Sequence, residues 1–326
     1  MHHLLPNHTG SLRIAAISDI HSNWSGLEAC LDYLEKVEQP DAVLLLGDHL
    51  TDLSSPERTM DLLRGVRDTT PSFFLSGNRE ERLLAHYRRY AHADLGAQEP
   101  SSASGSFVYT AACLSRESWN WLETMPDQAV IKIGNAPPLT VCHGSLQNSR
   151  DELWTGTPEL EETWDLMETD ILLHGHTHTY EVITNGSKRI VGVGQVSFNT
   201  VLENWTEEKI RSYLAKPSPG EATVHAGITV LDWSPSDEDY QIRSVDVPYD
   251  PFEIIDEVLN SELNRLAPWW IQGILRELIT GDKYVLQMIQ QAQDHARRRT
   301  SGEVGHLTEE DFVQAYRRIT GYNSVD

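Results

Sequence analysis

Three short apolar segments that alternate with helical patterns constrain the fold of this chain more than any other feature. Residues 12–18 (LRIAAIS), 42–46 (AVLLL) and 72–76 (SFFLS) are predicted to be buried strands. Apolar residues at helical spacing follow each strand, at 25–37, 54–66 and 80–92, with Val37 the last residue of the first helical pattern. Strands that are joined through helices predict a parallel sheet with right-handed crossovers, which is an α/β fold.

The rest of the chain divides into a strand-rich part and a helical part. A polar loop at 94–106, a helical stretch at 115–124 and a polar excursion at 203–220 separate groups of short strands. These strands are predicted at 129–133, 139–142, 171–174, 180–184, 189–193, 223–233 and 241–247. From Pro251 onward the apolar spacing is helical. We therefore expect two domains, at residues 1–250 and 251–326.

The charge of the chain argues against two classes of partner. Its 326 residues include 26 Lys and Arg and 49 Asp and Glu, a formal net charge of −23. Of these, 12 acids and 8 bases lie beyond residue 250, so residues 1–250 have a net charge of 18 − 37 = −19. Nucleic-acid phosphates and anionic lipid headgroups are repelled by such a surface. We therefore expect no binding to nucleic-acid duplexes or to membranes.

The cysteines and the lack of a long apolar segment predict a cytoplasmic protein. Cys30, Cys113 and Cys142 form no C-x-x-C pair, which argues against a disulfide framework and against a cysteine zinc site. Residues 1–11 lack the apolar stretch of a signal peptide, and no window reaches the roughly 18 apolar residues of a membrane span.

Residue types that bind metals stand directly after the predicted strands. The strand ends carry Asp19 and His21, Asp48, Asn78 and Glu80, His143, and then His174, His176 and His178. Because open α/β sheets bind ligands at the carboxyl ends of their strands, we expect these side chains to meet. A mixed set of oxygen and nitrogen ligands suits Mn, Fe, Co, Ni or Zn better than Mg or Ca. The alternative is a set of unrelated surface histidines and acids.

The order of these motifs resembles that of the calcineurin-like binuclear metallophosphoesterases. The family pattern is D-x-H, G-D, G-N-H-[D/E], H and G-H-x-H, and this chain has D-I-H at 19–21, G-D at 47–48, G-N-R-E at 77–80, His143 and G-H-T-H at 175–178. The resemblance covers about residues 12–250. It implies a four-layer α/β/β/α sandwich, with the C-terminal helices as an extension. The segment S-D-I-H-S-N at 18–23 is similar to the small bacterial and archaeal phosphodiesterase branch, which is diadenosine-tetraphosphatase-like.

The resemblance also implies a role for each residue of the site. It implies two divalent transition-metal ions, one bound by Asp19, His21 and His178 and the other by Asn78, His143 and His176, with Asp48 bridging both. Asp48 would thereby take part in catalysis, and Asn78 would also lie against the substrate. The two ions would hold the phosphate, and a hydroxide bridging them would attack phosphorus in line.

One residue departs from the family pattern. Arg79 stands where the family has a histidine that contacts phosphate and protonates the leaving group. Arginine stays charged near neutral pH, so Arg79 can bind a phosphate oxygen as a catalytic and substrate-binding residue but cannot act as a general acid. Alternatively, Arg79 pairs with Glu80 or with a nearby acid on the following helix. His49, next to Asp48, either supplies the missing imidazole or stays outside the site.

Together these features predict an enzyme that hydrolyses a small or nucleotide-like phosphodiester with a good leaving group. A dinucleoside polyphosphate hydrolase, a phosphomonoesterase and a non-catalytic scaffold of the same fold stay open as alternatives. A protein Ser/Thr phosphatase is disfavoured, because residues 47–53 do not follow the G-D-x-V-D-R-G block of those enzymes. The C-terminal helices would be an appendage packed on the catalytic part, a lid that narrows substrate choice, or a contact between two copies in a homo-oligomer.

Overall fold

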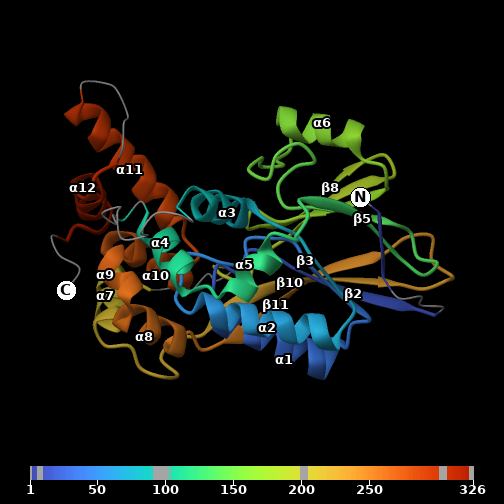
Figure 1. Cartoon of the computed structure of the whole chain (residues 1–326), viewed down its shortest axis with the longest axis horizontal. Coiled ribbons are helices and arrows are strands. Elements are labelled where there is room, and N and C mark those ends of the chain that lie inside the picture. The colour runs from blue at the N-terminus through green and yellow to red at the C-terminus, as the bar shows by residue number, and fades with distance from the viewer. Residues whose placement is uncertain are drawn as a thin grey trace.

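Two β-sheets packed face to face form the centre of the protein (Figure 1). The structure is a computed structural model that describes residues 2–5, 10–90, 102, 104–198, 205–300 and 307–322. One sheet has the order β11-β10-β2-β3-β4, formed by Gln241–Tyr249, Val224–Trp233, Leu12–Ile17, Ala42–Leu45 and Ser72–Phe74. The other has the order β1-β5-β6-β7-β9-β8, formed by His2–Leu5, Gln128–Ile133, Leu139–Cys142, Ile171–His174, Lys188–Val193 and Tyr180–Asn185.

The register of the first sheet brings the ends of its central strands to one edge. Strands β2, β3 and β4 run parallel, as predicted, and Leu45 of β3 lies opposite both Ile17 of β2 and Phe74 of β4. The residues that follow these strands therefore leave the sheet side by side. In the second sheet β6, β7 and β9 are also parallel, so β6 and β7 contribute their carboxyl ends in the same way.

Helices cover the outer faces of both sheets, which completes four layers. Helices α1 (Trp24–Tyr33) and α2 (Pro56–Thr69) pack on the first sheet, and α6 (Pro158–Leu166) packs on the second. Alternate residues of β2 point to opposite faces: Ala15 and Ile17 contact the helices, whereas Ile14 and Ala16 belong to the core between the sheets. The expected α/β/β/α sandwich is therefore confirmed.

The helix that follows β2 differs from its sequence pattern at its end. Residues Leu34–Glu38 wind as a π-helix, which shifts the face that each side chain presents. As a result Leu34 is buried but Val37 is 57% exposed, so the prediction that Val37 continues the apolar face was wrong. The helix also begins at Trp24, where the Asn23 side chain accepts a hydrogen bond from Gly26 N.

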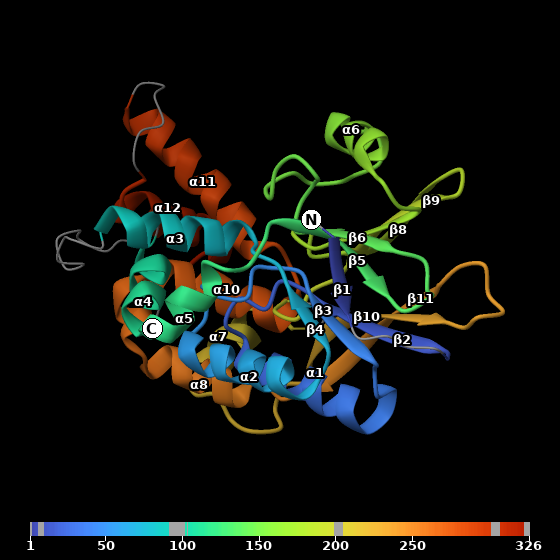
Figure 2. The ribbon, with the colours of Figure 1, turned by 45° about the vertical axis from the view of Figure 1, so that its right-hand side comes forward.

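A second group of helices gathers beside the sheets, at the left of Figures 1 and 2. It contains α7 (Glu207–Ala215), α8 (Phe252–Asn260), α9 (Glu262–Leu266), α10 (Pro268–Thr280), α11 (Tyr284–Arg299) and α12 (Glu309–Thr320). Trp24 and Leu53 of the α/β part belong to the same apolar cluster, so these helices pack on that part. The division into two domains near residue 250 stays a prediction. None of the described helices is both long enough and apolar enough to span a bilayer.

Among the described residues between β4 and β5 there are three further helices: α3 (Asn78–Tyr90), α4 (Gly105–Cys113) and α5 (Arg116–Leu122). Most of the loop predicted at 94–106 falls outside the described residues. The sequence pattern did not reveal α4, nor α7 within the polar excursion, nor the first strand, β1. Each of these elements is stabilised by its neighbours in the fold and lacks a strong local pattern.

Candidate metal centre

The seven predicted ligands meet where β2, β3, β4, β6 and β7 end. Five of them have a backbone in the left-handed region, with φ of 53° at Asp19, 51° at His21, 52° at Asp48, 63° at His176 and 57° at His178. Side chains other than glycine rarely adopt this conformation, and such residues cluster at functional sites. The turns after β2 and β3 stabilise each other, because Asp19 N donates a hydrogen bond to Gly47 O (3.1 Å) and His21 N donates one to Asp48 O (3.0 Å).

Asp19, His21 and His178 form the first of two groups whose ligand atoms lie within 4.8 Å of one another. Asp19 Oδ1 is buried without a hydrogen bond and lies 3.3 Å from His178 Nε2 and 3.9 Å from His21 Nε2. The two imidazole Nε2 atoms lie 3.2 Å apart. Nitrogen lone pairs that face each other beside an unpartnered carboxylate oxygen fit a shared cation.

Asp48, His143 and His176 form the second group. His143 Nδ1 lies 2.7 Å from Leu46 O, which orients the ring so that Nε2 faces Asp48 Oδ1 at 3.4 Å and Asn78 Oδ1 at 3.1 Å. His176 Nε2 lies 3.0 Å from the carbonyl oxygen of Arg150, so its other ring nitrogen is left for the cluster. Asn78 therefore joins this group through its amide oxygen.

The electrostatics of the cluster also fit cations. Burial opposes the charged form of Asp48 and Asp19, but neighbouring groups, chiefly His143 for Asp48 and His178 for Asp19, hold both carboxyl pKa values below their usual range. Burial likewise opposes protonation of His143, yet Asp48 and Asp19 raise its pKa to about 10. Divalent ions bound here would displace such protons, because histidine binds metals in its neutral form.

Glu80 holds the turn that carries Asp48. Its Oε2 accepts hydrogen bonds from Asp48 N (2.8 Å) and Gly77 N (2.9 Å), and its Oε1 accepts from His49 N (2.9 Å) and Leu50 N (3.1 Å). Four backbone donors converge on one buried carboxylate, so Glu80 is not the partner of Arg79. The close approach also needs a glycine at 77, where a Cβ would lie 2.3 Å from Asp48 N.

Arg79 lies at the edge of the cluster and is 21% exposed. Its Nη2 is 3.2 Å from Asp52 Oδ2 and its Nε is 3.8 Å from Asp48 Oδ2. Arg79 thus has an acidic partner, but this partner is Asp52 in the loop after β3 and not Glu80 or another acid of α3. The guanidinium also lines the cavity next to the two groups, where a phosphate would lie.

Asp52 is a residue of the site that the sequence analysis missed. It is buried, its Oδ2 lies 2.9 Å from His21 Nδ1, and its Oδ1 accepts a hydrogen bond from Trp270 Nε1 at 3.1 Å. The contact with His21 turns His21 Nε2 toward Asp19, as supporting carboxylates do for metal-binding histidines. The available signal was a second acid four residues after Asp48 in the same turn.

His49 and Cys142 lie outside the cluster. His49 is buried, its Nε2 lies 2.9 Å from Leu75 O, and its ring packs against Phe74. It cannot replace the missing catalytic histidine from this position. Cys142 faces away from His143 into the core beneath α6, as its place on the strand predicted.

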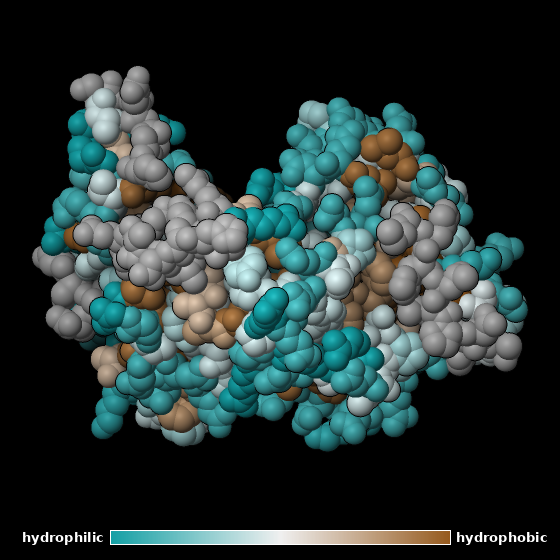
Figure 3. All heavy atoms as spheres, viewed as in Figure 1, coloured by the Kyte–Doolittle hydropathy of each residue, from teal (hydrophilic) through white to brown (hydrophobic). Residues whose placement is uncertain are grey.

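A cavity of about 420 Å³ opens over the cluster. His21, His176, His178 and Arg79 line one side of it, and residues of α10 and α11 line the other. Lys283, which precedes α11, lies 5.9 Å from the ring of Trp154, in the segment before α6. Figure 3 shows the surface hollowed between the part that carries α11 and the part that carries α6.

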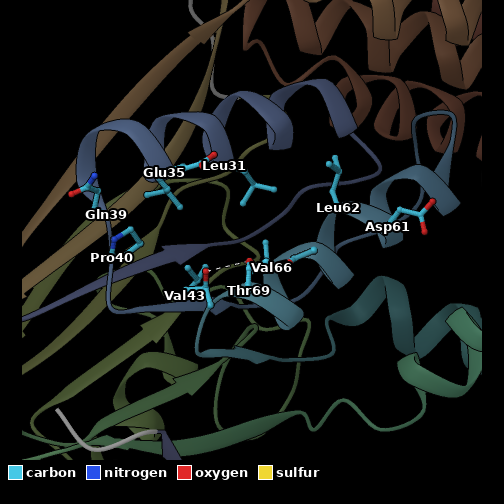
Figure 4. A pocket seen from close by; sticks show the side chains of 12 residues that line it. Leu31, Glu35, Gln39, Pro40, Val43, Asp61, Leu62, Val66 and Thr69 are labelled. Atoms are coloured by element: carbon cyan, nitrogen blue, oxygen red, sulfur yellow. Dashed lines mark hydrogen bonds between the residues drawn. The ribbon is translucent and has the colours of Figure 1, made fainter.

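A larger cavity, of about 600 Å³, lies far from these residues between α1, the π-helix and α2 (Figure 4). Aliphatic side chains such as Leu31, Leu62 and Val66 line it, together with the acids Glu35 and Asp61. It contains no histidine and no cation among its lining residues, so it offers none of the chemistry found at the cluster.

Comparisons with known proteins agree with this site. A family model described as calcineurin-like phosphoesterase matches residues 12–180, which is 169 of the 326 residues. A solved structure of a hypothetical protein from Pyrococcus horikoshii is similar at 19% identity and a TM-score of 0.62, over 83% of this chain and 99% of that chain. A metallophosphoesterase from Sphaerobacter thermophilus is similar at 18% identity and a TM-score of 0.54, with the same coverage. No curated protein sequence matches the chain. The family match, which spans all seven residues of the metal cluster, shows that this chain belongs to the calcineurin-like phosphoesterase family.

Proposed function

We propose that this protein hydrolyses a singly charged phosphodiester with the help of two divalent metal ions. One observation carries the proposal: both three-residue groups of metal-ligand type reach the same cavity, one through His21 and His178 and the other through His176, and the Arg79 guanidinium lines it with them. Divalent cations and a guanidinium together neutralise a phosphoryl group, which is the main task of an enzyme that transfers phosphoryl groups.

Each group would hold one ion. Asp19, His21 and His178 would bind the first, and Asn78, His143 and His176 the second. Asp48 would bridge them, because its carboxylate oxygens lie 3.4 Å from His143 Nε2 and 3.9 Å from His21 Nε2. When bound, such ions polarise the phosphate and lower the pKa of a coordinated water to near neutrality. Manganese is our first choice for reconstitution, since carboxylate, amide and imidazole ligands suit it.

Arg79 favours diesters over monoesters. Its guanidinium binds one phosphate oxygen but cannot donate a proton to the departing oxygen near neutral pH. A diester carries one negative charge, which Arg79 can match, and a good leaving group departs without protonation. The lack of an imidazole at this position, with His49 turned away from the cluster, supports this preference.

Metal reconstitution followed by a substrate panel tests the proposal. We expect the protein loaded with Mn²⁺, Co²⁺ or Ni²⁺ to cleave bis-p-nitrophenyl phosphate faster than p-nitrophenyl phosphate. Asp48→Asn should abolish this activity and reduce the bound metal. Asp68→Asn is the matched control, because Asp68 is 61% exposed on α2, away from the cluster.

The panel also separates the alternatives. Activity that survives Asp48→Asn with an unchanged metal requirement would overturn the proposal. Faster cleavage of a dinucleoside polyphosphate or of a monoester would replace the diester with that substrate class. A metal-loaded protein that cleaves no mono- or diester would favour a non-catalytic scaffold.

A further inference from the structure

An apolar patch lines the cavity beside the metal cluster, and its Phe198 ring packs against the rings of His21 and His178. It consists of Phe198, which follows β9, Ile274 of α10, and Val285, Leu286 and Ile289 of α11. Leu286 is 48% exposed, whereas Leu275 and Leu278 of the neighbouring helix α10 are buried. A large aliphatic side chain exposed inside a cavity that also contains a catalytic-type cluster indicates a surface for an apolar ligand group.

The patch is held in a fixed place relative to the cluster. Trp270 of α10 donates a hydrogen bond to Asp52, which in turn contacts His21. Helix α10 ends at Gly281 with φ of 70°, and Glu277 Oε2 accepts a hydrogen bond from Val285 N in the first turn of α11 (3.0 Å). Glu277 lines the same cavity as His21 and His178, so this residue links the cluster side of the cavity to the start of α11.

The charges around the patch disfavour a second phosphate. Glu152, Glu277 and Lys283 are the charged residues that line the cavity away from Arg79 and Asp52. Two acids against one cation leave no surplus positive charge for the further phosphates of a polyphosphate chain. An uncharged, apolar group meets no such penalty.

We infer that this patch binds an aromatic or branched aliphatic ester group of the substrate while the phosphate lies at the metal cluster. The inference rests on the proposed function and narrows it, because it assigns the choice of diester to Leu286 and its neighbours on α11. It also gives the C-terminal helices a role as one wall of the active-site cavity.

Equilibrium binding of two uncleaved diesters tests this inference. Diphenyl phosphate and dimethyl phosphate carry the same single charge and differ in their ester groups. By calorimetry on the manganese-loaded protein, we expect diphenyl phosphate to bind at least about tenfold more tightly, since its rings cover the patch. Two variants, Leu286→Ala and Leu286→Asn (Asn is similar in size to Leu but polar), should lower the affinity for diphenyl phosphate about five- to tenfold. The affinity for dimethyl phosphate should stay unchanged.

Val37→Ala is the matched control, because Val37 is an exposed aliphatic residue (57%) on the far helical layer. Equal weakening of both diesters in the Leu286 variants, or no weakening of either, would overturn the inference. If the proposed function is wrong, the wild-type protein will cleave no diester at all. The binding preference for diphenyl phosphate is measured separately and would still decide whether the patch binds an apolar ester group.

Discussion

Asp52 joins three segments of the chain that are far apart in the sequence. It contacts His21 after β2, Arg79 at the start of α3 and Trp270 in α10. A buried carboxylate with this set of donors orients both a proposed metal ligand and the proposed phosphate-binding arginine. At the scale of single residues, the site therefore depends on a side chain that itself binds neither metal nor phosphate.

Replacing Asp52 with asparagine should weaken metal binding while the fold is kept. The amide has nearly the same shape but no charge to oppose Arg79 and a poorer acceptor for His21 Nδ1. We expect about 10- to 100-fold lower affinity for Mn²⁺, measured by calorimetry. Asp61→Asn is the control, since Asp61 is 70% exposed on α2. Unchanged affinity in Asp52→Asn would show that His21 does not need this support.

Replacing Arg79 with histidine should change the preference between monoesters and diesters. An imidazole at this position can protonate a departing oxygen, as in the family pattern, whereas the guanidinium cannot. We expect the ratio of kcat/KM for p-nitrophenyl phosphate to that for bis-p-nitrophenyl phosphate to rise about tenfold or more. Arg82→His, one turn further along α3 over the Phe107 ring, should leave the ratio unchanged. A ratio that does not rise would show that Arg79 does not set this preference.

At the scale of secondary-structure elements, one buried carboxylate holds helices α11 and α12 together. Asp311 accepts hydrogen bonds from Thr308 N (2.7 Å) at the start of α12 and from Arg299 Nη2 (2.8 Å) at the end of α11, and it contacts His295 Nδ1 (2.7 Å). Burial alone would raise the pKa of Asp311, but Arg299, Thr308 and His295 hold it well below its usual range. The α11 wall of the cavity thus depends on an ionised Asp311.

The effect of Asp311→Asn should depend on pH. Because the folded-state pKa is lowered, the ionised form contributes stability at pH values above the unfolded-state pKa of about 4, and this contribution is lost as the pH falls further. We expect the variant to lose about 2 kcal/mol of unfolding free energy at pH 7, and the difference in Tm from wild type to shrink below about pH 4. Asp294→Asn, at an exposed pair on α11, should show neither effect. A pH-independent difference would mean that packing, not charge, explains the loss.

The whole molecule carries its negative charge mostly outside the site. Of its 49 acids, Asp19, Asp48, Asp52 and Glu80 are buried at the cluster, where histidines, Arg79 and backbone N–H groups surround them. Two bound divalent ions would offset these four negative charges locally. An anionic substrate therefore approaches through the field of a surface with a formal net charge near −23 and meets positive charge only close to the cluster.

Added salt should consequently speed substrate capture. Raising the ionic strength from about 0.01 M to 0.15 M shortens the Debye length from about 30 Å to about 8 Å, which screens the long-range repulsion more than the contacts at the cluster. We expect kcat/KM for bis-p-nitrophenyl phosphate to rise over this range, with kcat nearly constant. A kcat/KM that falls steadily with salt would instead indicate that a positive surface guides the substrate.

Local pattern was sufficient for the parallel sheet and for bringing the ligands together, whereas the four layers were implied by the family resemblance. Alternating strands and helices define a parallel sheet, and residues that follow parallel strands must leave it at one edge, so Asp19, Asp48 and Asn78 meet whatever the rest of the chain does. The same logic placed His143 and His178 at the ends of β6 and β7. The roles of all seven predicted residues as metal ligands stay predictions, which the metal-binding experiments test.

The remaining features were decided by tertiary packing. Glu80 accepts hydrogen bonds from four backbone N–H groups, and Asp52 accepts one from Trp270, which is 218 residues away in the sequence. Leu286 stays exposed in the cavity beside a cluster that is far from it in the sequence. None of these partners shares a periodic pattern with the residue that it contacts. The sequence by itself determined which side chains stand at the sheet edge, because strand direction and spacing are local properties. Only the packed structure decided which buried carboxylate meets which donor, and which helix covers the cavity, because those contacts depend on how distant elements stack.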